Sequence, residues 1–355
     1  MKNPIKSLGL LAIALTAACG APQSGTEVTP PAAGEAEKPV LHIYSARHYD
    51  SDQILYAAFE NEAGVEVEVR EAKADQLLET MKAEGDVSPA DLIIASDAGA
   101  LWRFQSAGLT QAVESNELND LVAPEFREAD GHWFGVARRL RLVAYDPTQI
   151  SPDQVDEWTD LADPALEGEI CVRASSNIYN LSLMAELIDR VGADRAQNWA
   201  EGVVSNMARA PQGGDTDQVK AVAAGECSVA IVNHYYWARL SQSAAEADRA
   251  VANATTLIVP DFPDGGGAHV NITGAAVSRT AEDPGLAARF IAFMLTAEGQ
   301  DLLTRETQEF PLSDTTPPPP GAELVPAFAP GATPLETFGR NQAEAQRLYD
   351  LAGWN

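Results

Sequence analysis

From residue 40 onward, the hydrophobic pattern alternates between short apolar runs and amphipathic stretches. The apolar runs, and one run that alternates with a period of two, are typical of strands, and the amphipathic stretches are typical of helices. The first helix is expected to be capped by Ser51 or Asp50 and to end at Gly64. This alternation predicts an α/β fold with a mostly parallel sheet covered by helices. We expect strands at 40–45, 65–72 and 90–96 and helices at 50–64, 74–85 and 99–108.

A second strand–helix series follows the first. Four consecutive prolines at 317–320 prevent regular structure in the loop 314–326. The pattern predicts two α/β lobes joined by at least two crossover strands, which is the geometry of a hinged cleft. We expect strands at 139–147, 169–175, 228–232, 255–262 and 271–278, and helices at 180–192, 194–206, 215–225 and 282–305, with one or two more at 334–353.

The domain organisation follows from the same pattern. The first lobe is predicted to span 40–138, with part of 262–310 returning to it. The second lobe is predicted to span 139–261, with part of 311–355 added to it.

The N-terminus has the pattern of an export signal. Lys2 and Lys6 precede an apolar stretch at 8–18, which is too short to span a bilayer. The residues before Cys19 resemble a bacterial lipobox, so residues 1–19 are predicted to be a lipoprotein signal peptide ending at a lipidated Cys19. Thr16 is a less usual residue three positions before the cysteine of a lipobox. Cleavage by the ordinary signal peptidase, without lipidation, therefore stays an alternative. The segment 20–39 is rich in Pro, Ala, Gly and Glu and is predicted to be a flexible tether. We therefore expect an exported, periplasmic protein anchored through Cys19.

The charge balance excludes one class of partner. The chain of 355 residues has 52 acidic and 24 basic residues, and its net charge is −28. A field of this sign repels phosphate backbones and anionic lipid, so nucleic acid is not expected as a partner. The excess acid serves solubility or a mild attraction for cations, and composition alone leaves both open.

Two cysteines remain beyond Cys19, at positions 171 and 227. In an exported protein, an isolated pair of this kind most simply forms a disulfide. Neither Cys171 nor Cys227 has a neighbouring His or Cys at metal-ligand spacing, so a cysteine-based metal site is not expected.

Sequence motifs of the common hydrolases and nucleotide-binding enzymes are missing. The chain has no G-x-S-x-G, H-E-x-x-H or G-x-x-x-x-G-K-[ST] motif. His42, His132 and His269 lie in or near predicted strands or turns and are interpreted as structural.

Three tyrosine-bearing stretches follow predicted strands. RHYDSD contains His48 and Tyr49, SSNIYNLS contains Tyr179, and NHYYWARL contains Tyr235 and Tyr236. Ligands of α/β lobes bind at the carboxyl ends of parallel strands. We therefore expect these five side chains, which come from both lobes, to meet across one cleft.

The adjacent tyrosines decide the chemistry of this site. A single buried tyrosine is more often core packing with a hydrogen-bonded hydroxyl. In a strand, Tyr235 and Tyr236 would point to opposite faces, whereas at a helix start they diverge by only about 100° and can converge on one atom. Phenolate is a hard anionic ligand with a pKa near 10, so only a strong Lewis acid binds it at neutral pH. Several tyrosines with at most one histidine indicate ferric iron rather than calcium, zinc or copper.

These stretches resemble the iron-binding motifs of bacterial ferric-ion ABC-transporter binding proteins, especially the cyanobacterial type. The resemblance extends from about residue 40 to 355 and includes GVARRLRLVAYDP, NITGAAV, EFPL and FGRNQAEAQRLYDLAGW. It implies a type II periplasmic binding fold with two lobes. It also implies a monomeric, non-enzymatic protein that carries Fe(III) to an ABC permease in the cytoplasmic membrane.

The resemblance also assigns residue roles. It implies Tyr49, Tyr179, Tyr235 and Tyr236 as phenolate ligands and His48, less securely, as the fifth ligand. It implies that Arg139 and Arg239 lie beside the site, where they would offset four phenolates around a +3 ion. The family usually has K-R-A-R where this chain has Arg138-Arg139-Leu140-Arg141, which affects only the surroundings of the ligands. His234, between Asn233 and Tyr235, is interpreted as a bystander.

Two alternatives remain at this point. The same fold could bind a polyamine, which needs carboxylates at the strand ends, or an anion, which would use the arginines at 138, 139 and 141. From another class, a tethered hydrolase lacks an identifiable nucleophile and base.

Overall fold

The computed structural model describes residues 38–47, 49–313 and 315–355. The predicted signal peptide, Cys19, most of the predicted tether and His48 lie outside the described residues. Within the described part, none of the helices has the length and apolar character needed to cross a membrane.

The first three strands form the parallel sheet that the sequence predicts. β1 (Val40–Ser45) lies between β2 (Glu66–Glu71) and β3 (Leu92–Ala95), and both pairings are parallel. Every residue of β3 is buried, as expected of a strand covered on both faces. The connecting helices α1 (Asp52–Ala63) and α2 (Ala74–Glu84) match the predicted ones.

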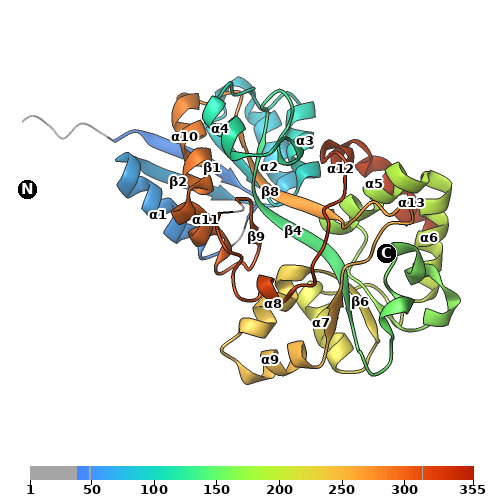
Figure 1. Cartoon of the computed structure of the whole chain (residues 1–355). Coiled ribbons are helices and arrows are strands. Elements are labelled where there is room, and N and C mark those ends of the chain that lie inside the picture. The colour runs from blue at the N-terminus through green and yellow to red at the C-terminus, as the bar shows by residue number, and fades with distance from the viewer. Residues whose placement is uncertain (1–37, 48, 314) are drawn as a thin grey trace, which may run out of the picture. The chain divides into compact units, whose positions relative to one another are not determined.

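The centre of the sheet is antiparallel, where β8 and β4 run against their neighbours, so the expectation of a mostly parallel sheet is wrong for this part. β8 (Val270–Val277) pairs antiparallel with β3, and β4 (Phe134–Tyr145) pairs antiparallel with β8. β4 begins well before the predicted residue 139, because its N-terminal residues pair with β8. The strand order is β2-β1-β3-β8-β4-β6-β5 (Figure 1).

β4 joins the two halves of the sheet. Its residues 134–140 pair with β8, and its residues 141–145 pair with β6 (Val229–Asn233). Of the described strands, β4 has partners in both halves, whereas β8 pairs with β3 and with the first part of β4. We propose a lobe boundary inside β4, at the change of partner between residues 140 and 141, close to the predicted boundary at 138–139.

The second half of the sheet contains short strands. β5 (Ile170–Cys171) pairs parallel with β6, and β7 (Thr256–Ile258) pairs with β4. The predicted strand 169–175 is wrong in its second part. The chain bends there, because the carbonyls of Arg173 and Ala174 accept hydrogen bonds from the Asn180 amide instead of a neighbouring strand. β9 (Phe310–Pro311) pairs with β4 in the first half.

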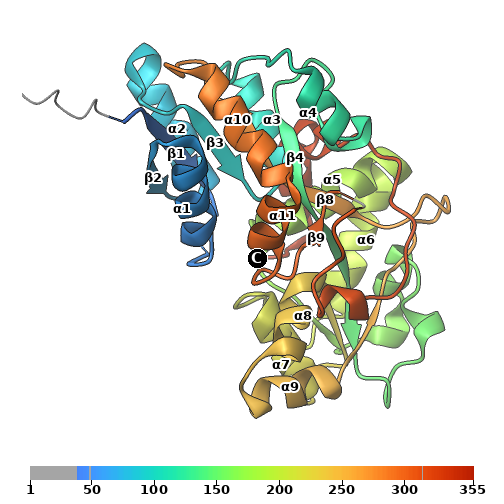
Figure 2. The same ribbon diagram turned by 60° about the vertical axis from the view of Figure 1, so that its left-hand side comes forward.

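Helices cover both halves of the sheet, and Figure 2 shows α7, α8 and α9 together at the end of the molecule remote from α10. The predicted helix 282–305 is two helices, because Thr296 ends one and its hydroxyl caps the next. The helix α4 and a separate helix α9 were not predicted. The remaining helices are α3 (Ala98–Ser106), α4 (Asn116–Leu121), α5 (Ile178–Val191), α6 (Ala193–Ser205), α7 (Asp215–Ala223), α8 (His234–Gln242), α9 (Glu246–Asn253), α10 (Pro284–Leu295), α11 (Ala297–Thr304), α12 (Glu336–Arg340) and α13 (Gln342–Ala352). Short 3-10 turns lie at Gly85–Val87, Pro124–Phe126, Pro152–Gln154, Trp158–Ala162, Pro164–Leu166 and Ala322–Leu324.

The second lobe is stabilised by an aromatic core and by the predicted disulfide. Trp354 near the C-terminus lies 4.7 Å from the Tyr349 ring and 6.0 Å from the Trp199 ring, measured between ring centres. Cys171 on β5 is bonded to Cys227 beside β6, 56 positions later in the sequence. Closing a loop of this length stabilises the fold by about 4 kcal/mol in the chain-entropy description.

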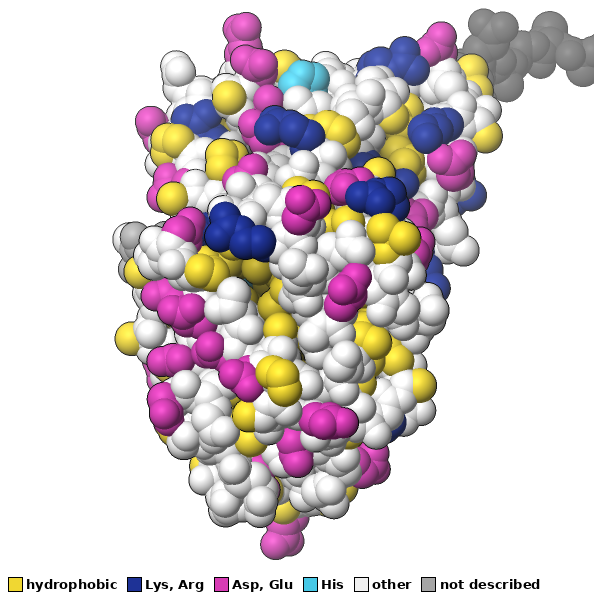
Figure 3. Space-filling view, turned by 90° about the vertical axis from the view of Figure 1, so that its right-hand side faces the viewer, with side chains coloured by type: hydrophobic (Ala, Val, Ile, Leu, Met, Phe, Trp, Pro, Cys, Tyr) yellow, Lys and Arg dark blue, Asp and Glu magenta, His cyan; other side chains and the backbone are white. Residues whose placement is uncertain are grey.

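The acidic side chains are spread over the surface. On the face in Figure 3 they are scattered among other residues, and most of the Lys and Arg side chains lie in its upper half. This distribution is typical of charge that keeps a protein soluble.

Candidate metal centre

Tyr235 and Tyr236 occupy the first turn of α8, directly after β6. The predicted helix start is thereby confirmed, and both phenol rings leave the helix on neighbouring sides. Their ring centres are 4.5 Å apart and their planes are tilted by 32°. Tyr235 is only 1% exposed, whereas Tyr236 is half-buried.

Tyr179 approaches this pair from the first turn of α5. Asn177 caps that helix, and its side-chain oxygen accepts a hydrogen bond from the Tyr179 backbone N–H. The Tyr235 hydroxyl donates a 3.1 Å hydrogen bond to the Tyr179 hydroxyl. The Asn233 amide lies 3.4 Å from the same Tyr235 oxygen. The two helix starts therefore bring two phenol oxygens into direct contact.

Tyr49 comes from the first lobe, in the segment between β1 and α1. Its backbone carbonyl accepts a hydrogen bond from the Asp52 N–H at 2.9 Å, which fixes the turn. The Arg239 guanidinium lies 5.5 Å from the Tyr49 ring centre, 5.2 Å from that of Tyr235 and 4.7 Å from that of Tyr236. One cation thus touches three rings. The structure brings together four of the five predicted ligands, which we call the tyrosine cluster: Tyr49, Tyr179, Tyr235 and Tyr236.

Burial opposes the ionisation of three cluster phenols, those of Tyr49, Tyr235 and Tyr236. Burial raises the pKa of Tyr49 to about 12, and the neighbouring Tyr179 phenol adds to the shift. Burial also raises the pKa of Tyr235 and Tyr236 above the ordinary value, again with a contribution from Tyr179. These three phenols therefore ionise together only when a concentrated positive charge replaces their protons.

Arginines surround the tyrosine cluster. Arg139 on β4 is 2% exposed, and its guanidinium lies 4.9 Å from the Tyr179 ring centre. It donates to the Ile272 carbonyl at 2.8 Å and to Asp97 at 3.1 Å. Arg139 and Arg239 therefore lie beside the tyrosines, as predicted.

Sequence reasoning missed two further arginines. The Arg173 guanidinium lies 5.7 Å from the Tyr179 ring centre, and the Arg47 guanidinium lies 4.9 Å from the Tyr49 ring centre. Arg173, in CVRAS, precedes Tyr179 by six residues, and Arg47, in ARHY, precedes Tyr49 by two. This closeness in sequence to predicted ligands was the signal that could have found them.

The arginines of β4 do not form an open anion site. Arg141 is buried and donates to Asp215 at 2.7 Å and to Asn180 at 2.5 Å. Arg139, which lies on the same face of β4 as Arg141, donates to Asp97. Arg138 alternates to the other face, where its Nε donates to the Pro311 carbonyl at 3.1 Å. This arrangement disfavours the anion alternative.

The described histidines have structural partners. Leu140 N–H donates to Nδ1 of His234 at 3.1 Å, and Nε2 of the same ring bonds to the Gln308 carbonyl at 3.0 Å. Burial lowers the pKa of His234 to about 3, so the ring is neutral and both nitrogens are occupied. In the described residues, no three His, Cys, Asp or Glu side chains gather in a metal-binding group. The candidate donors there are therefore the tyrosines.

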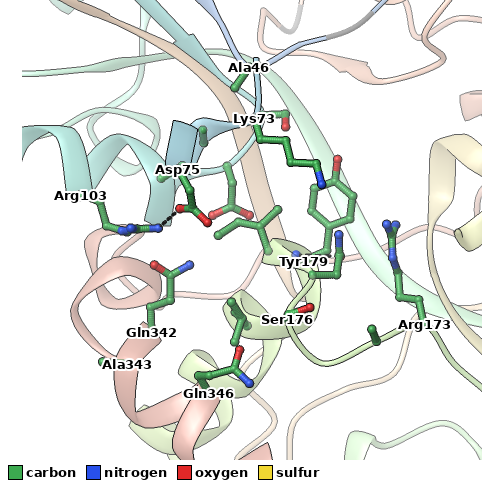
Figure 4. Close-up of a pocket in the computed structure, with 18 of the residues that line it drawn as sticks. Ala46, Lys73, Asp75, Arg103, Arg173, Ser176, Tyr179, Gln342, Ala343 and Gln346 are labelled. Atoms are coloured by element: carbon green, nitrogen blue, oxygen red, sulfur yellow. Dashed lines mark hydrogen bonds and ion pairs between the residues drawn. The ribbon is translucent and has the colours of Figure 1, made fainter. Parts of the chain in front are cut away.

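Two pockets border the tyrosine cluster. A pocket of about 700 Å³ is lined by Tyr179 and Arg173 on one side and by Lys73 and Arg103 on the other. Figure 4 shows Lys73 extending toward Tyr179, and Arg103 paired with Asp75. A second pocket of about 500 Å³ is lined by residues that include Tyr236, Arg239, Lys220 and Gln308.

Comparison with known proteins identifies the family. Residues 88–333 match the family described as bacterial extracellular solute-binding protein. The chain belongs to this family. It is therefore an exported solute-binding protein rather than an enzyme, as the sequence predicted.

Proteins of similar sequence cover nearly all of the chain. Iron uptake protein A1 of Synechocystis is 37% identical over 96% of this chain and 93% of its own length. The major ferric iron-binding protein of Neisseria meningitidis serogroup B is 28% identical over 88% of each chain.

Solved structures confirm the predicted two-lobed fold. FutA (IdiA) of Trichodesmium, in complex with iron and citrate ligands, has a TM-score of 0.84 and 38% identity over 89% of this chain and 100% of that chain. Apo FutA2 from Synechocystis also has a TM-score of 0.84, with 36% identity over 90% of this chain and 100% of that chain.

The buried ion pair between Arg141 and Asp215 generates a stability prediction. Replacing Asp215→Asn leaves Arg141 without its carboxylate, so we expect the free energy of unfolding to fall by about 3–5 kcal/mol. Urea unfolding measures this change. The exposed pair between Arg347 and Glu344 is the control, and Glu344→Gln should leave stability unchanged. Unchanged stability of Asp215→Asn would show that the arginine does not depend on this partner.

Proposed function

We propose that this protein captures Fe(III) outside the cytoplasm and delivers it to an ABC permease. The observation that carries the proposal is the tyrosine cluster: four phenol oxygens, drawn from three segments and both lobes, with a guanidinium against three of the rings. The proposal is also supported by the relatives named for iron uptake and ferric iron binding, and by the similar structure in complex with iron and citrate.

We propose the four cluster tyrosines as phenolate ligands, with His48 as the fifth ligand. Fe(III) is a hard cation of high charge and suits anionic oxygen donors. His48 directly precedes Tyr49 in the chain, and the resemblance of RHY to the family's iron-binding motif supports it as a ligand. This donor set would join both lobes through one ion.

The charge balance explains the surrounding arginines. Four phenolates around Fe(III) leave an excess negative charge, and burial makes an uncompensated charge costly. Arg239 has no carboxylate partner among the described residues, so its charge is available to the tyrosines. Arg139 and Arg173 each pair with a carboxylate and also face Tyr179, so they contribute less.

The polyamine alternative is disfavoured by the same charges. A polyamine site needs free carboxylates, yet Asp97, Asp215 and Glu309 near the cluster are each engaged by an arginine. Arg239 would repel a cationic ligand of low charge density.

Transport requires that the lobes open and close around the ion. Tyr49 lies on the first lobe and the other three tyrosines lie on the second, so iron favours the closed arrangement by contacting both. Radioactive iron uptake by cells with and without this protein tests delivery to a permease, and unchanged uptake would contradict it.

We propose that Cys19 carries a lipid that tethers the protein to a membrane. The lipobox-like sequence at the end of the signal peptide supports this, and Cys19→Ser should move the protein from the membrane fraction to the soluble fraction of the envelope. Cell fractionation followed by immunoblotting measures this. A wild-type protein found entirely in the soluble fraction would favour plain signal-peptidase cleavage.

Removing two ligands tests the iron site itself. The iron-loaded protein should show a visible phenolate-to-iron charge-transfer band, and Tyr235→Phe with Tyr236→Phe should abolish it. The affinity for Fe(III) should fall by more than the roughly 10- to 100-fold that loss of an outer partner costs. Visible spectra and competition with a chelator measure both.

A matched control is Tyr145→Phe, because Tyr145 is a buried tyrosine at the end of β4 outside the cluster. This variant should keep full colour and affinity. Full colour in the double variant would refute the assignment.

Arg239 should tune the affinity without being a ligand. Arg239→Gln removes a cation that has no carboxylate partner among the described residues, so we expect Fe(III) affinity to fall by about 10- to 100-fold while the charge-transfer band persists. Arg239→Lys should recover part of the loss. Chelator competition measures the affinity, and exposed Arg347→Gln is the control. An unchanged affinity in Arg239→Gln would exclude the charge-balancing role.

A further inference from the structure

We infer that His234 is a positioning residue that connects the two tyrosine-bearing lobes through Gln308 and Glu309. The inference rests on the proposed function, because the side chains that His234 positions are the proposed iron ligands. His234 is not a ligand itself, since both of its ring nitrogens are hydrogen-bonded to backbone groups.

His234 fixes the start of α8 in one orientation. The ring is 0% exposed and lies stacked on Phe310, with ring centres 4.5 Å apart. Nδ1 accepts from Leu140 N–H on β4, and Nε2–H donates to the Gln308 carbonyl. The Tyr235 ring meets this imidazole edge-on at 5.6 Å. The residue before the tyrosine pair is therefore held from two sides by separate segments.

Gln308 is the strained member of this connection. Its φ is 61°, and no other non-glycine residue in the described part of the chain has a positive φ. Its N–H donates to the Thr304 carbonyl at 2.8 Å, and its side-chain oxygen accepts from Gly321 N–H at 2.8 Å. A left-handed conformation of this kind persists only where surrounding contacts impose it, and such strain clusters at functional sites. Here the conformation presents the carbonyl of Gln308 to His234.

Glu309 continues the connection to the other lobe. Its carboxylate accepts from Arg47 at 2.9 Å and from the Thr273 hydroxyl at 2.7 Å. Arg47 also binds Asp52 through two hydrogen bonds, at 2.9 and 3.1 Å. The Arg47 guanidinium lies 4.9 Å from the ring centre of Tyr49, two residues further along the chain.

An unbroken series of contacts thus joins Tyr49 to Tyr235 without passing through the metal position. It runs from the Tyr49 turn through Arg47 and Glu309 to Gln308, and from there through His234 to α8. Arg47, Glu309, Gln308 and His234 are buried, so each hydrogen bond between them is costly to lose. Two backbone partners satisfy the buried ring, and one of them, the Gln308 carbonyl, belongs to a residue with a left-handed backbone that leads directly into Glu309.

The test separates positioning from packing. His234→Phe keeps the ring and the stacking on Phe310 but removes both hydrogen bonds. We expect the charge-transfer band of the iron-loaded variant to shift and the Fe(III) affinity to fall by about 10-fold or more. His234→Gln places an amide donor near the Nε2 position and should recover part of both. Visible spectroscopy and chelator competition on the full chain measure these effects.

His269→Phe is the matched control. His269 is also buried, pairs with Glu186 and lies 5.0 Å from the Phe338 ring, yet it contacts none of the tyrosines. Its replacement should lower thermal stability and leave the band and the affinity unchanged. If His234→Phe does not fold, Glu309→Gln breaks the connection at Arg47 instead and should produce the same spectral shift.

Folded His234→Phe or Glu309→Gln protein with the wild-type band and affinity would overturn the inference, whatever the change in thermal stability. A wild-type protein that binds no Fe(III) and gives no band would overturn the proposed function, and the inference with it. These two failures are distinguishable because the second is visible before any substitution is made.

Discussion

The hydroxyl of Tyr235 donates a 3.1 Å hydrogen bond to the hydroxyl of Tyr179, and this contact joins the first turns of α8 and α5. Tyr236 and Tyr49 complete the cluster. Phenols gathered in a buried place resist ionisation, as the raised pKa values of Tyr49 and Tyr235 show. The site is thereby suited to a cation strong enough to replace several protons at once and poorly suited to weaker Lewis acids.

The arrangement of arginines follows from the same constraint. Arg47, Arg139, Arg141 and Arg173 are each tied to a carboxylate, which fixes their positions and absorbs most of their charge. Arg239 differs, because among the described residues it faces aromatic rings and no acid. The paired arginines therefore line the site in fixed positions, whereas no carboxylate in the described part of the chain balances the charge of Arg239.

Much of the fold was predictable because strand and helix patterns are local. β1 and α1 appeared where the hydrophobic period placed them, and the adjacent tyrosines after a predicted strand were enough to suggest a helix start with converging phenols. Predictions failed where pairing between distant segments decided the outcome. β4 starts at Phe134 because β8 lies beside it, and the strand after residue 169 stops early because Asn180 takes its carbonyls.

The sequence by itself determined the residue types of the site, their places at the ends of strands, and the pairing of the two cysteines. It could not assign partners to buried polar groups, because those partners lie far away along the chain. Glu309 meets Arg47 across 262 positions, and His234 meets Leu140 across 94. Only the tertiary structure decided that His234 faces the backbone and not the metal position, since a ring's orientation depends on which donors and acceptors the folded chain brings to it.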